Sequence, residues 1–285
     1  MTEEEQAQHD GDYQSLLALY IALLKNIHSD NREESLYALA ELRTDIAFQN
    51  VIKGLGIDYE RALALLQGSD DGEGLTKEEV AMRDRLLAAI RNLIDFSVCE
   101  EYQLYDETLE AVGEDEVDFN SEDYEDYLAL CEKYNDMYAA VENGDIRYAG
   151  AVAAMWMRFS SLDYVVYWTQ NDSKVRPWHL ALQGYSAPMD EFPSWMIPPI
   201  EYNCRCFLTS LDASLGSADL KKVKASSVKP EKPIQIDDVY GESLAKCGRI
   251  FGPSHSYFSV RDSDRKMLDG FVLRLKEKYY GKHRN

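Results

Sequence analysis

Apolar residues recur at three- and four-residue intervals through much of the N-terminal half, which is the spacing of one buried face of an α-helix. The pattern predicts helices over residues 13–27, 33–55, 76–94 and 146–159. Gly54 and Gly56 are expected to break the second helix. Thr76 and Glu79 have the spacing of a capping box and are expected to open the third. The N-terminal half is therefore predicted to be mainly helical.

A further helix is expected after Ser121, which is a candidate N-cap. Its aromatic and apolar residues form one stripe at helical spacing: Tyr124, Tyr127, Leu128, Cys131, Tyr134 and Tyr138. Core packing is the ordinary explanation of such a stripe. An aromatic binding surface is the alternative, because tyrosine is enriched in interfaces. The Asn143-Gly144 pair predicts a turn before the next helix.

The composition changes after residue 160, where β-branched and aromatic residues predict strands over 164–169 and 206–211. Small, polar and lysine-rich residues from 213 to 236 predict a linker. A last helix is expected over 265–279, ended by Gly281. The predicted fold class is α+β: a helical acidic region (1–142), a small α+β module (143–212), the linker (213–236) and a C-terminal tail with a helix (237–285).

Charge separates the two halves more sharply than hydrophobicity does. The chain carries a net charge of −21; residues 1–150 hold 36 acidic and 11 basic side chains, against 15 and 19 in the remainder. An acidic surface repels phosphate, so direct nucleic-acid binding by the first half is not expected. That surface could face a basic protein, or it could simply be solvated. The mild excess of basic residues in the tail likewise allows either interpretation.

The flanks and hydropathy of the chain favour a protein without a membrane segment. Apolar runs long enough to cross a bilayer, about 20 residues, are absent from the sequence. The first twelve residues are acidic and polar, unlike a secretory signal peptide, so synthesis in a cytoplasm is expected. Five cysteines are too few and too scattered for a disulfide framework in 285 residues.

Chemistry-bearing residues gather between the two predicted strands. An Asp-x-x-x-Arg-x-x-His segment is followed by a glycine, a further aspartate, the Pro198-Pro199 pair and Cys-Arg-Cys at the start of the second strand. The residues in question are Asp172, Arg176, His179, Gly184, Asp190, Cys204, Arg205 and Cys206. Each piece is common, but their order and spacing together are specific.

Over roughly residues 145–212 this composite resembles the phage Mu F-like head morphogenesis family. The resemblance implies a minor head protein of a tailed phage or prophage, without enzymatic activity. Such a protein acts in the host cytoplasm during procapsid assembly, contacts portal, scaffold or major capsid protein, and ends in the virion. Many members carry a histidine before the Cys-x-Cys; here residues 200–203 read Ile-Glu-Tyr-Asn, which puts a metal site that relies on that histidine in doubt.

Two interpretations of these polar residues remain open. His179, Cys204 and Cys206, with Asp190 or Glu201 as fourth ligand, could form a structural zinc site. Adjacent odd positions of an extended strand lie about 7 Å apart, so a turn would be needed for both sulfurs to reach one ion. Alternatively, no metal is bound. The thiols are then buried, His179 bonds a carboxylate, and Arg176 or Arg205 pairs with Asp172.

Enzymatic alternatives fit less well. A zinc deaminase needs His-x-Glu and Pro-Cys-x-x-Cys, and neither motif occurs. A Cys-His hydrolase using His179 with Cys204 or Cys206 is conceivable. A Mu F-like module fused to a toxin or effector is a further alternative, although the stretch after Leu211 is short and linker-like. Glycine-rich nucleotide-binding motifs are absent from the sequence.

Overall fold

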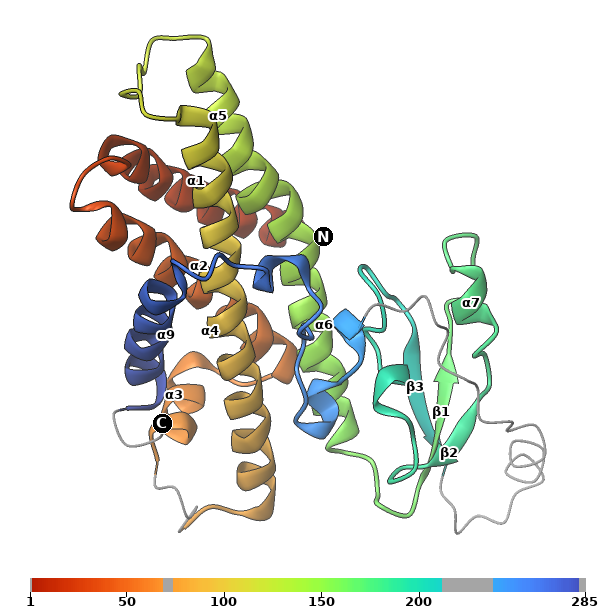
Figure 1. Cartoon of the computed structure of the whole chain (residues 1–285). Helices are drawn as coiled ribbons and strands as arrows, with labels where there is room; N and C mark the ends of the chain where they lie inside the picture. Colours follow the sequence, from red (N-terminus) through yellow and green to blue (C-terminus); the bar gives the residue numbers. More distant parts are fainter. Residues whose placement is uncertain (1, 69–73, 212–237, 282–285) are drawn as a thin grey trace.

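The computed structural model describes residues 2–68, 74–211 and 238–281. The N-terminal helices are α1 (Glu3–Asn26), α2 (Arg32–Leu55), α3 (Tyr59–Gln67) and α4 (Lys77–Val112). They are followed by α5 (Asp123–Glu132), a π-helical segment η1 (Lys133–Tyr138) and α6 (Ala139–Trp156), which form one long rod beside α4 (Figure 1). The predicted linker at 213–236 lies outside the described residues. None of the helices in the described ranges is both long and apolar enough to cross a bilayer.

Two helices begin where capping boxes satisfy their first backbone N–H groups. Thr76 and Glu79 exchange side-chain and backbone hydrogen bonds as predicted. Thr2 and Glu5 do the same, so α1 starts at Glu3 rather than near Tyr13. Helix α4 continues to Val112, well beyond the predicted end, because buried residues still recur along its second half. The helical N-terminal region is confirmed.

Two glycines bring α2 and α6 into close contact. A Cβ atom on Gly54 would lie 2.0 Å from the Arg147 carbonyl oxygen, and one on Gly150 would lie 2.6 Å from that of Val51. The sequence predicted that Gly54 breaks α2. Instead, the helix continues through Gly54, which lets the neighbouring backbone approach. Gly56 ends the helix, with φ of +71°. This close packing joins α6 to the helical body.

Local turn signals in this region were also wrong. Asn143 and Gly144 lie inside α6, because packing against α2 outweighs their turn preference. The predicted boundary between residues 142 and 143 consequently falls within a helix. Helix α5 begins at Asp123, and Ser121 does not cap it. In the tyrosine stripe, Tyr127 and Tyr134 are core residues, whereas Tyr138 is 42% exposed.

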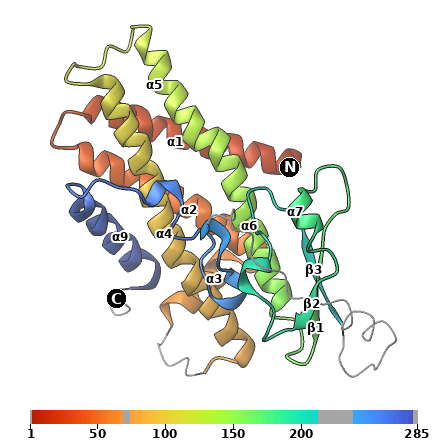
Figure 2. The same cartoon turned by 45° about the vertical axis from the view of Figure 1, so that its right-hand side comes forward.

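A three-stranded antiparallel sheet follows α6, confirming the α+β class. Its strands are β1 (Tyr164–Trp168), β2 (Ser186–Pro188) and β3 (Phe207–Leu211), in the order β2-β1-β3. Tyr164 pairs with both Pro188 and Leu211, which sets the register. The first and third strands match the predictions; the short β2 was not predicted. The sheet lies on the side of α6 away from the other long helices (Figure 2).

The C-terminal segment returns to the helical body instead of forming a free tail. After three short 3-10 turns, η4 (Asp238–Tyr240), η5 (Leu244–Lys246) and η6 (Ser256–Phe258), it ends in α9 (Arg265–Tyr280). The α9 residues Phe271 and Tyr279 pack edge-on against Tyr37 and Phe48 of α2, at ring-centroid distances of 5.5 and 5.1 Å. The α+β module is therefore inserted between two parts of one helical body (Figure 1).

Candidate functional site

The loop after β1 places a histidine in the module core. Arg176 is extended, as expected before proline, and Pro177 starts the short helix α7 (Pro177–Leu180). His179 lies on this helix and is 2% exposed. Gly184, with φ of +78°, then turns the chain, and its N–H donates to the Tyr167 carbonyl of β1 at 2.9 Å. The loop is thereby tied back onto the sheet.

A second loop brings both cysteines beneath α7. Asn203, with φ of +56°, turns the chain just before β3, and its N–H donates to both Asp145 carboxylate oxygens at 3.0 and 3.1 Å. Cys204 and Cys206 precede β3 and are 5% and 3% exposed. The turn precedes both cysteines, and the segment 204–206 lies outside β3, where its two sulfurs converge.

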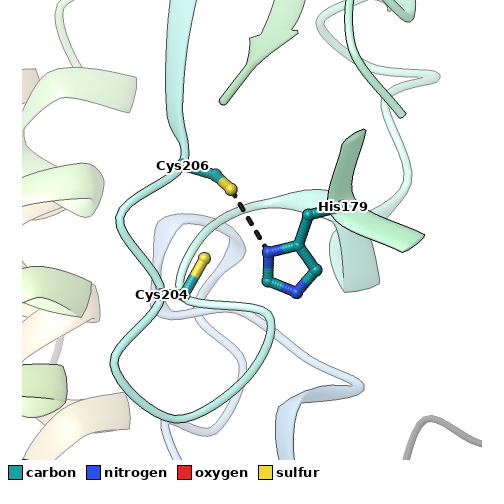
Figure 3. Close-up of side chains that lie close together, drawn as sticks. All are labelled: His179, Cys204 and Cys206. Atoms are coloured by element: carbon teal, nitrogen blue, oxygen red, sulfur yellow. Dashed lines mark hydrogen bonds between the residues drawn. The ribbon is translucent and has the colours of Figure 1, made fainter. Parts of the chain in front are cut away.

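Figure 3 shows the His179, Cys204 and Cys206 side chains pointing toward one another. The Nδ1 atom of His179 lies 3.3 Å from Cys206 Sγ. One ligand atom from each of the three residues lies within 4.8 Å of the other two. On the opposite side of the ring, Nε2 lies 3.1 Å from Glu201 Oε2. Because a carboxylate only accepts, Nε2 carries the proton there and Nδ1 is left facing the sulfurs.

The two thiols are not equivalent. A hydrogen bond from the Cys204 thiol lowers the pKa of Cys206 and outweighs burial, which raises it. The same hydrogen bond, together with burial, raises the pKa of Cys204. Cys206 is therefore the thiolate of the pair. Its burial shields the sulfur from a substrate carbonyl, which does not favour the hydrolase alternative.

The predicted Asp-Arg network separates into two pairings. Arg205 forms a bidentate ion pair with Asp172, with both N···O distances at 2.8 Å. Arg176 does not reach Asp172; its Nε lies 3.1 Å from Glu201 Oε2 and its Nη2 donates to the Tyr202 carbonyl at 2.9 Å. Glu201 therefore joins α7 to the loop before β3, as an acceptor for both Arg176 and His179.

Asp190, a predicted zinc ligand, is not brought to this cluster. It lies in the exposed turn after β2, and its carbonyl oxygen is 3.5 Å from Lys246 Nζ. In the described part of the chain, the His, Cys, Asp or Glu side chains that lie close enough together to bind one ion are His179, Cys204 and Cys206. Glu201 contacts His179 on the side away from the sulfurs, so it orients the ring and does not complete the shell.

Two adjoining hollows surround the cluster. The smaller, of about 20 Å³, is lined by His179 and both cysteines, among others. The larger, of about 660 Å³, is an open cavity between α6 and the module. Cys204 and the basic side chains of Lys174, Arg176 and Arg205 line both. The buried cluster therefore adjoins a cavity with a basic rim.

Asp145, at the floor of the larger cavity, is a site residue that the sequence analysis missed. It is 3% exposed and accepts hydrogen bonds from the Asn203 N–H and from Tyr240 Oη at 2.9 Å. Burial raises its pKa to about 7. The carboxylate thus links α6, the cysteine loop and the C-terminal segment. The sequence carried little signal for it, since it follows a dipeptide typical of turns.

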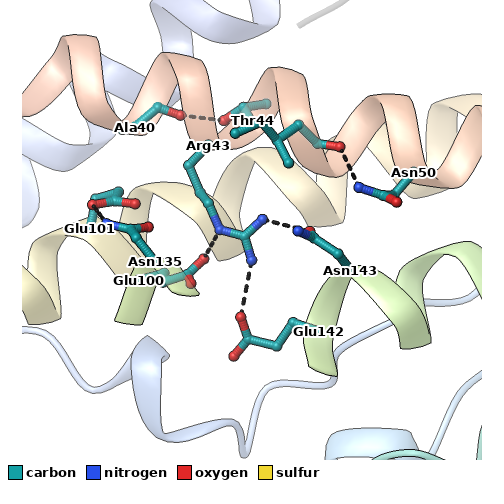
Figure 4. Close-up of polar contacts among 10 residues, drawn as sticks. Ala40, Arg43, Thr44, Asn50, Glu100, Glu101, Asn135, Glu142 and Asn143 are labelled. Atoms are coloured by element: carbon teal, nitrogen blue, oxygen red, sulfur yellow. Dashed lines mark hydrogen bonds and ion pairs between the residues drawn. The ribbon is translucent and has the colours of Figure 1, made fainter. Parts of the chain in front are cut away.

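A second buried polar cluster lies in the helical body (Figure 4). Arg43 of α2 is fully buried and donates to Glu100 of α4 at 2.7 Å and to Glu142 and Asn143 of α6 at 3.0 and 2.8 Å. Burial raises the pKa of Glu100, and it raises that of Glu101 to about 7. This cluster was not predicted, because charged residues in amphipathic helices ordinarily indicate a solvated face.

Residues 104–209 match the family model described as Phage Mu protein F like protein. The match ends within β3 and begins within α4, so it extends further toward the N-terminus than the motif resemblance over 145–212. Both the acidic connection before α5 and the His-Cys-Cys cluster fall inside it. No curated protein and no solved structure matches the chain.

Proposed function

Residues 104–209 belong to the phage Mu protein F-like family, and from this premise we propose that the chain is a minor head protein that docks on portal or scaffold protein during head assembly. It is then retained in the virion. The family match carries this proposal. The role is structural and not enzymatic, which agrees with a module whose thiolate is buried.

The acidic tip, defined as residues 110–126 between the end of α4 and the start of α5, supports a basic protein partner. It projects at one end of the helical body (Figure 1). The sequence places no basic residue among its nine exposed acidic side chains: Glu110, Glu114, Asp115, Glu116, Asp118, Glu122, Asp123, Glu125 and Asp126. One of them, Glu110, already pairs with Arg261 of the C-terminal segment. Opposite charge on a partner would speed association and set its orientation.

The α+β module serves in this proposal as a rigid knob. Its two loops are fixed by the Arg205–Asp172 pair and by the contacts of Glu201 with His179 and Arg176. The helical body then provides the contact with portal or scaffold, and the module sets the distance to neighbouring head subunits. Major capsid protein is the further candidate for that second contact.

Co-sedimentation with the portal, scaffold and major capsid proteins of the same phage genome tests the proposal. We expect the full chain to sediment with portal or scaffold. The variant Glu114→Gln/Asp115→Asn/Glu116→Gln should lose most of this binding, while the module variant Lys174→Ala keeps it. Both changes lie on exposed side chains, so both proteins should fold.

The opposite result, binding lost with Lys174→Ala and kept by the tip variant, would move the docking surface to the module. Absence of binding to all three proteins would overturn the head-assembly role. The gene neighbourhood gives an independent check. Portal and terminase genes beside this gene support assembly, whereas an immunity-like gene supports the toxin alternative.

A further inference from the structure

We propose that His179, Cys204 and Cys206 form a three-ligand zinc site whose fourth position faces the basic cavity and binds an oxyanion. This goes beyond the role in head assembly and does not depend on it. It also differs from a closed structural site, in which four protein side chains complete the shell. The proposal rests on the ligand set, on the space between the ligands and on the charge of the cavity.

The ligand set suits zinc. Zinc in proteins is bound tetrahedrally by thiolate and neutral imidazole, with Zn–S near 2.3 Å and Zn–N near 2.0–2.1 Å, which places neighbouring ligand atoms roughly 3.5–3.8 Å apart. The three ligand atoms here lie within 4.8 Å of one another, with Nδ1 3.3 Å from Cys206 Sγ. Small side-chain movements would bring all three to one ion.

The carboxylate of Glu201 prepares the histidine for this role. Metal-binding histidines usually donate their second N–H to a carboxylate or carbonyl, which fixes the tautomer and the ring orientation. The Nε2 atom of His179 lies 3.1 Å from Glu201 Oε2, and Trp178 Nε1 donates to the same oxygen at 3.1 Å. The Nδ1 lone pair is thereby directed toward the sulfurs (Figure 3).

Space for one ion exists beside the ligands. The hollow of about 20 Å³ is lined by all three of them. A hollow needs at least about 10–15 Å³ to hold a single water-sized sphere. The volume therefore fits one atom beside the imidazole and the two sulfurs, and it is too small for an organic ligand.

The larger cavity determines which ligand could occupy the fourth coordination position of the ion. Cys204 lines both hollows, so an ion bound to its sulfur would adjoin the cavity of about 660 Å³. Lys174, Arg176 and Arg205 line that cavity together with Asp145, whose carboxylate accepts from Asn203 and Tyr240. Arg205 also pairs with Asp172 and Arg176 with Glu201, and neither Asp190 nor Glu201 closes the shell. Arginine and lysine favour phosphate and carboxylate oxygens. An oxyanion bound to the ion would be surrounded by these cations.

Cobalt substitution of the full chain tests the metal site. Protein treated with chelator and then titrated with Co²⁺ should develop thiolate-to-cobalt charge transfer and the intense visible bands of tetrahedral coordination at one equivalent, and zinc should remove them. Cys204→Ser, Cys206→Ser and His179→Ala should each weaken cobalt binding at least tenfold. Cys247→Ser, which changes an exposed thiol elsewhere, should leave the spectrum unchanged.

Oxyanion probes test the open position. Inorganic phosphate and acetate, added separately to the cobalt protein, should shift the visible bands with saturation. Lys174→Ala and Arg205→Ala should retain the cobalt spectrum and weaken the response to the effective probe severalfold. Lys266→Ala, which changes an exposed side chain of α9, should leave that response unchanged. Whichever probe acts at lower concentration distinguishes a phosphate from a carboxylate source.

Two results would overturn the proposal at different points. A folded full chain, checked by circular dichroism, that takes up no cobalt at the thiols would exclude the metal site. A tetrahedral cobalt spectrum that neither probe alters would show a closed shell and exclude the oxyanion.

Discussion

Two buried polar clusters, one in the helical body and one in the inserted module, use similar components differently. Around Arg43, each nitrogen of the guanidinium donates to an acceptor on α4 or α6, so the cation is paired within the chain. Around His179, one histidine nitrogen meets Glu201 while the other faces two sulfurs beside a cavity. The cation of the first cluster therefore has its partners, whereas the second cluster retains capacity for a ligand.

The difference shows how burial alone misleads about function. Both clusters are nearly inaccessible, and both contain groups with shifted pKa values. Shifted pKa values arise in structural ion-pair networks as well as in functional sites. Glu142 of the first cluster also lines a cavity, of about 340 Å³, so adjoining space does not separate the two. What separates them is the kind of atoms present: a guanidinium that already has its acceptors, against two sulfurs and an imidazole nitrogen that converge on one point.

Removing the cation from the Arg43 cluster should have the largest effect. Arg43→Ala leaves Glu100 and Glu142 buried without their partner, and breaking a buried pair in this way costs about 3–5 kcal/mol. Urea unfolding followed by circular dichroism measures this loss. Arg32→Ala, at the exposed start of the same helix, should change stability by less than about 0.5 kcal/mol. Equal effects of both variants would show that the cluster contributes little.

The helix contact that supports this cluster should be nearly as sensitive. In Gly150→Ala the new Cβ would meet the Val51 carbonyl oxygen at 2.6 Å, and such overpacking costs about 1–3 kcal/mol. Gly144→Ala on the same helix meets nothing within 4 Å and should be neutral or stabilising by up to about 1 kcal/mol. Thermal unfolding of the two variants compares them directly. Equal melting temperatures would contradict close packing of α2 on α6.

Burial raises the pKa of two carboxyls of the helical body to about 7: Glu101 near Arg43, and Asp145 of α6, which faces the module. Between pH about 4 and 7 these groups bind more protons in the folded than in the unfolded chain, so stability should fall as the pH rises through that range. Urea midpoints at several pH values measure the slope. Glu101→Gln and Asp145→Asn should each flatten it, and an unchanged slope in both would contradict the raised pKa values.

The exposed Arg205–Asp172 pair should have the smallest effect on stability. Both side chains are nearly half exposed, and water and salt screen ion pairs of this kind. A double-mutant cycle with Arg205→Ala and Asp172→Ala should give a small coupling that weakens further at high salt. A coupling as large as the loss in Arg43→Ala would mean that the pair, and not the Glu201 contacts, holds the loop.

Local sequence patterns were sufficient to predict the helices and strands whose formation depends mainly on neighbouring residues. Helical spacing and the Thr76–Glu79 capping box located the long helices, and β-branched residues located β1 and β3, because these preferences act over a few neighbouring residues. Gly54, Gly144 and Ser121 gave wrong local predictions. For Gly54 the role depends on the α6 backbone that lies opposite, and no short window of sequence contains that information.

The site divides in the same way. The order of the motif from Asp172 to Cys206 was sufficient to indicate the family whose model matches residues 104–209, and to name His179 and both cysteines as candidates. Only the tertiary structure decided that Glu201, and not Asp190, faces His179, that Arg205 takes Asp172, and that Asp145 of α6 supports the cysteine loop. The sequence specifies which ligand atoms are available. The distances between segments far apart in the chain are set only when the helices and the sheet have packed.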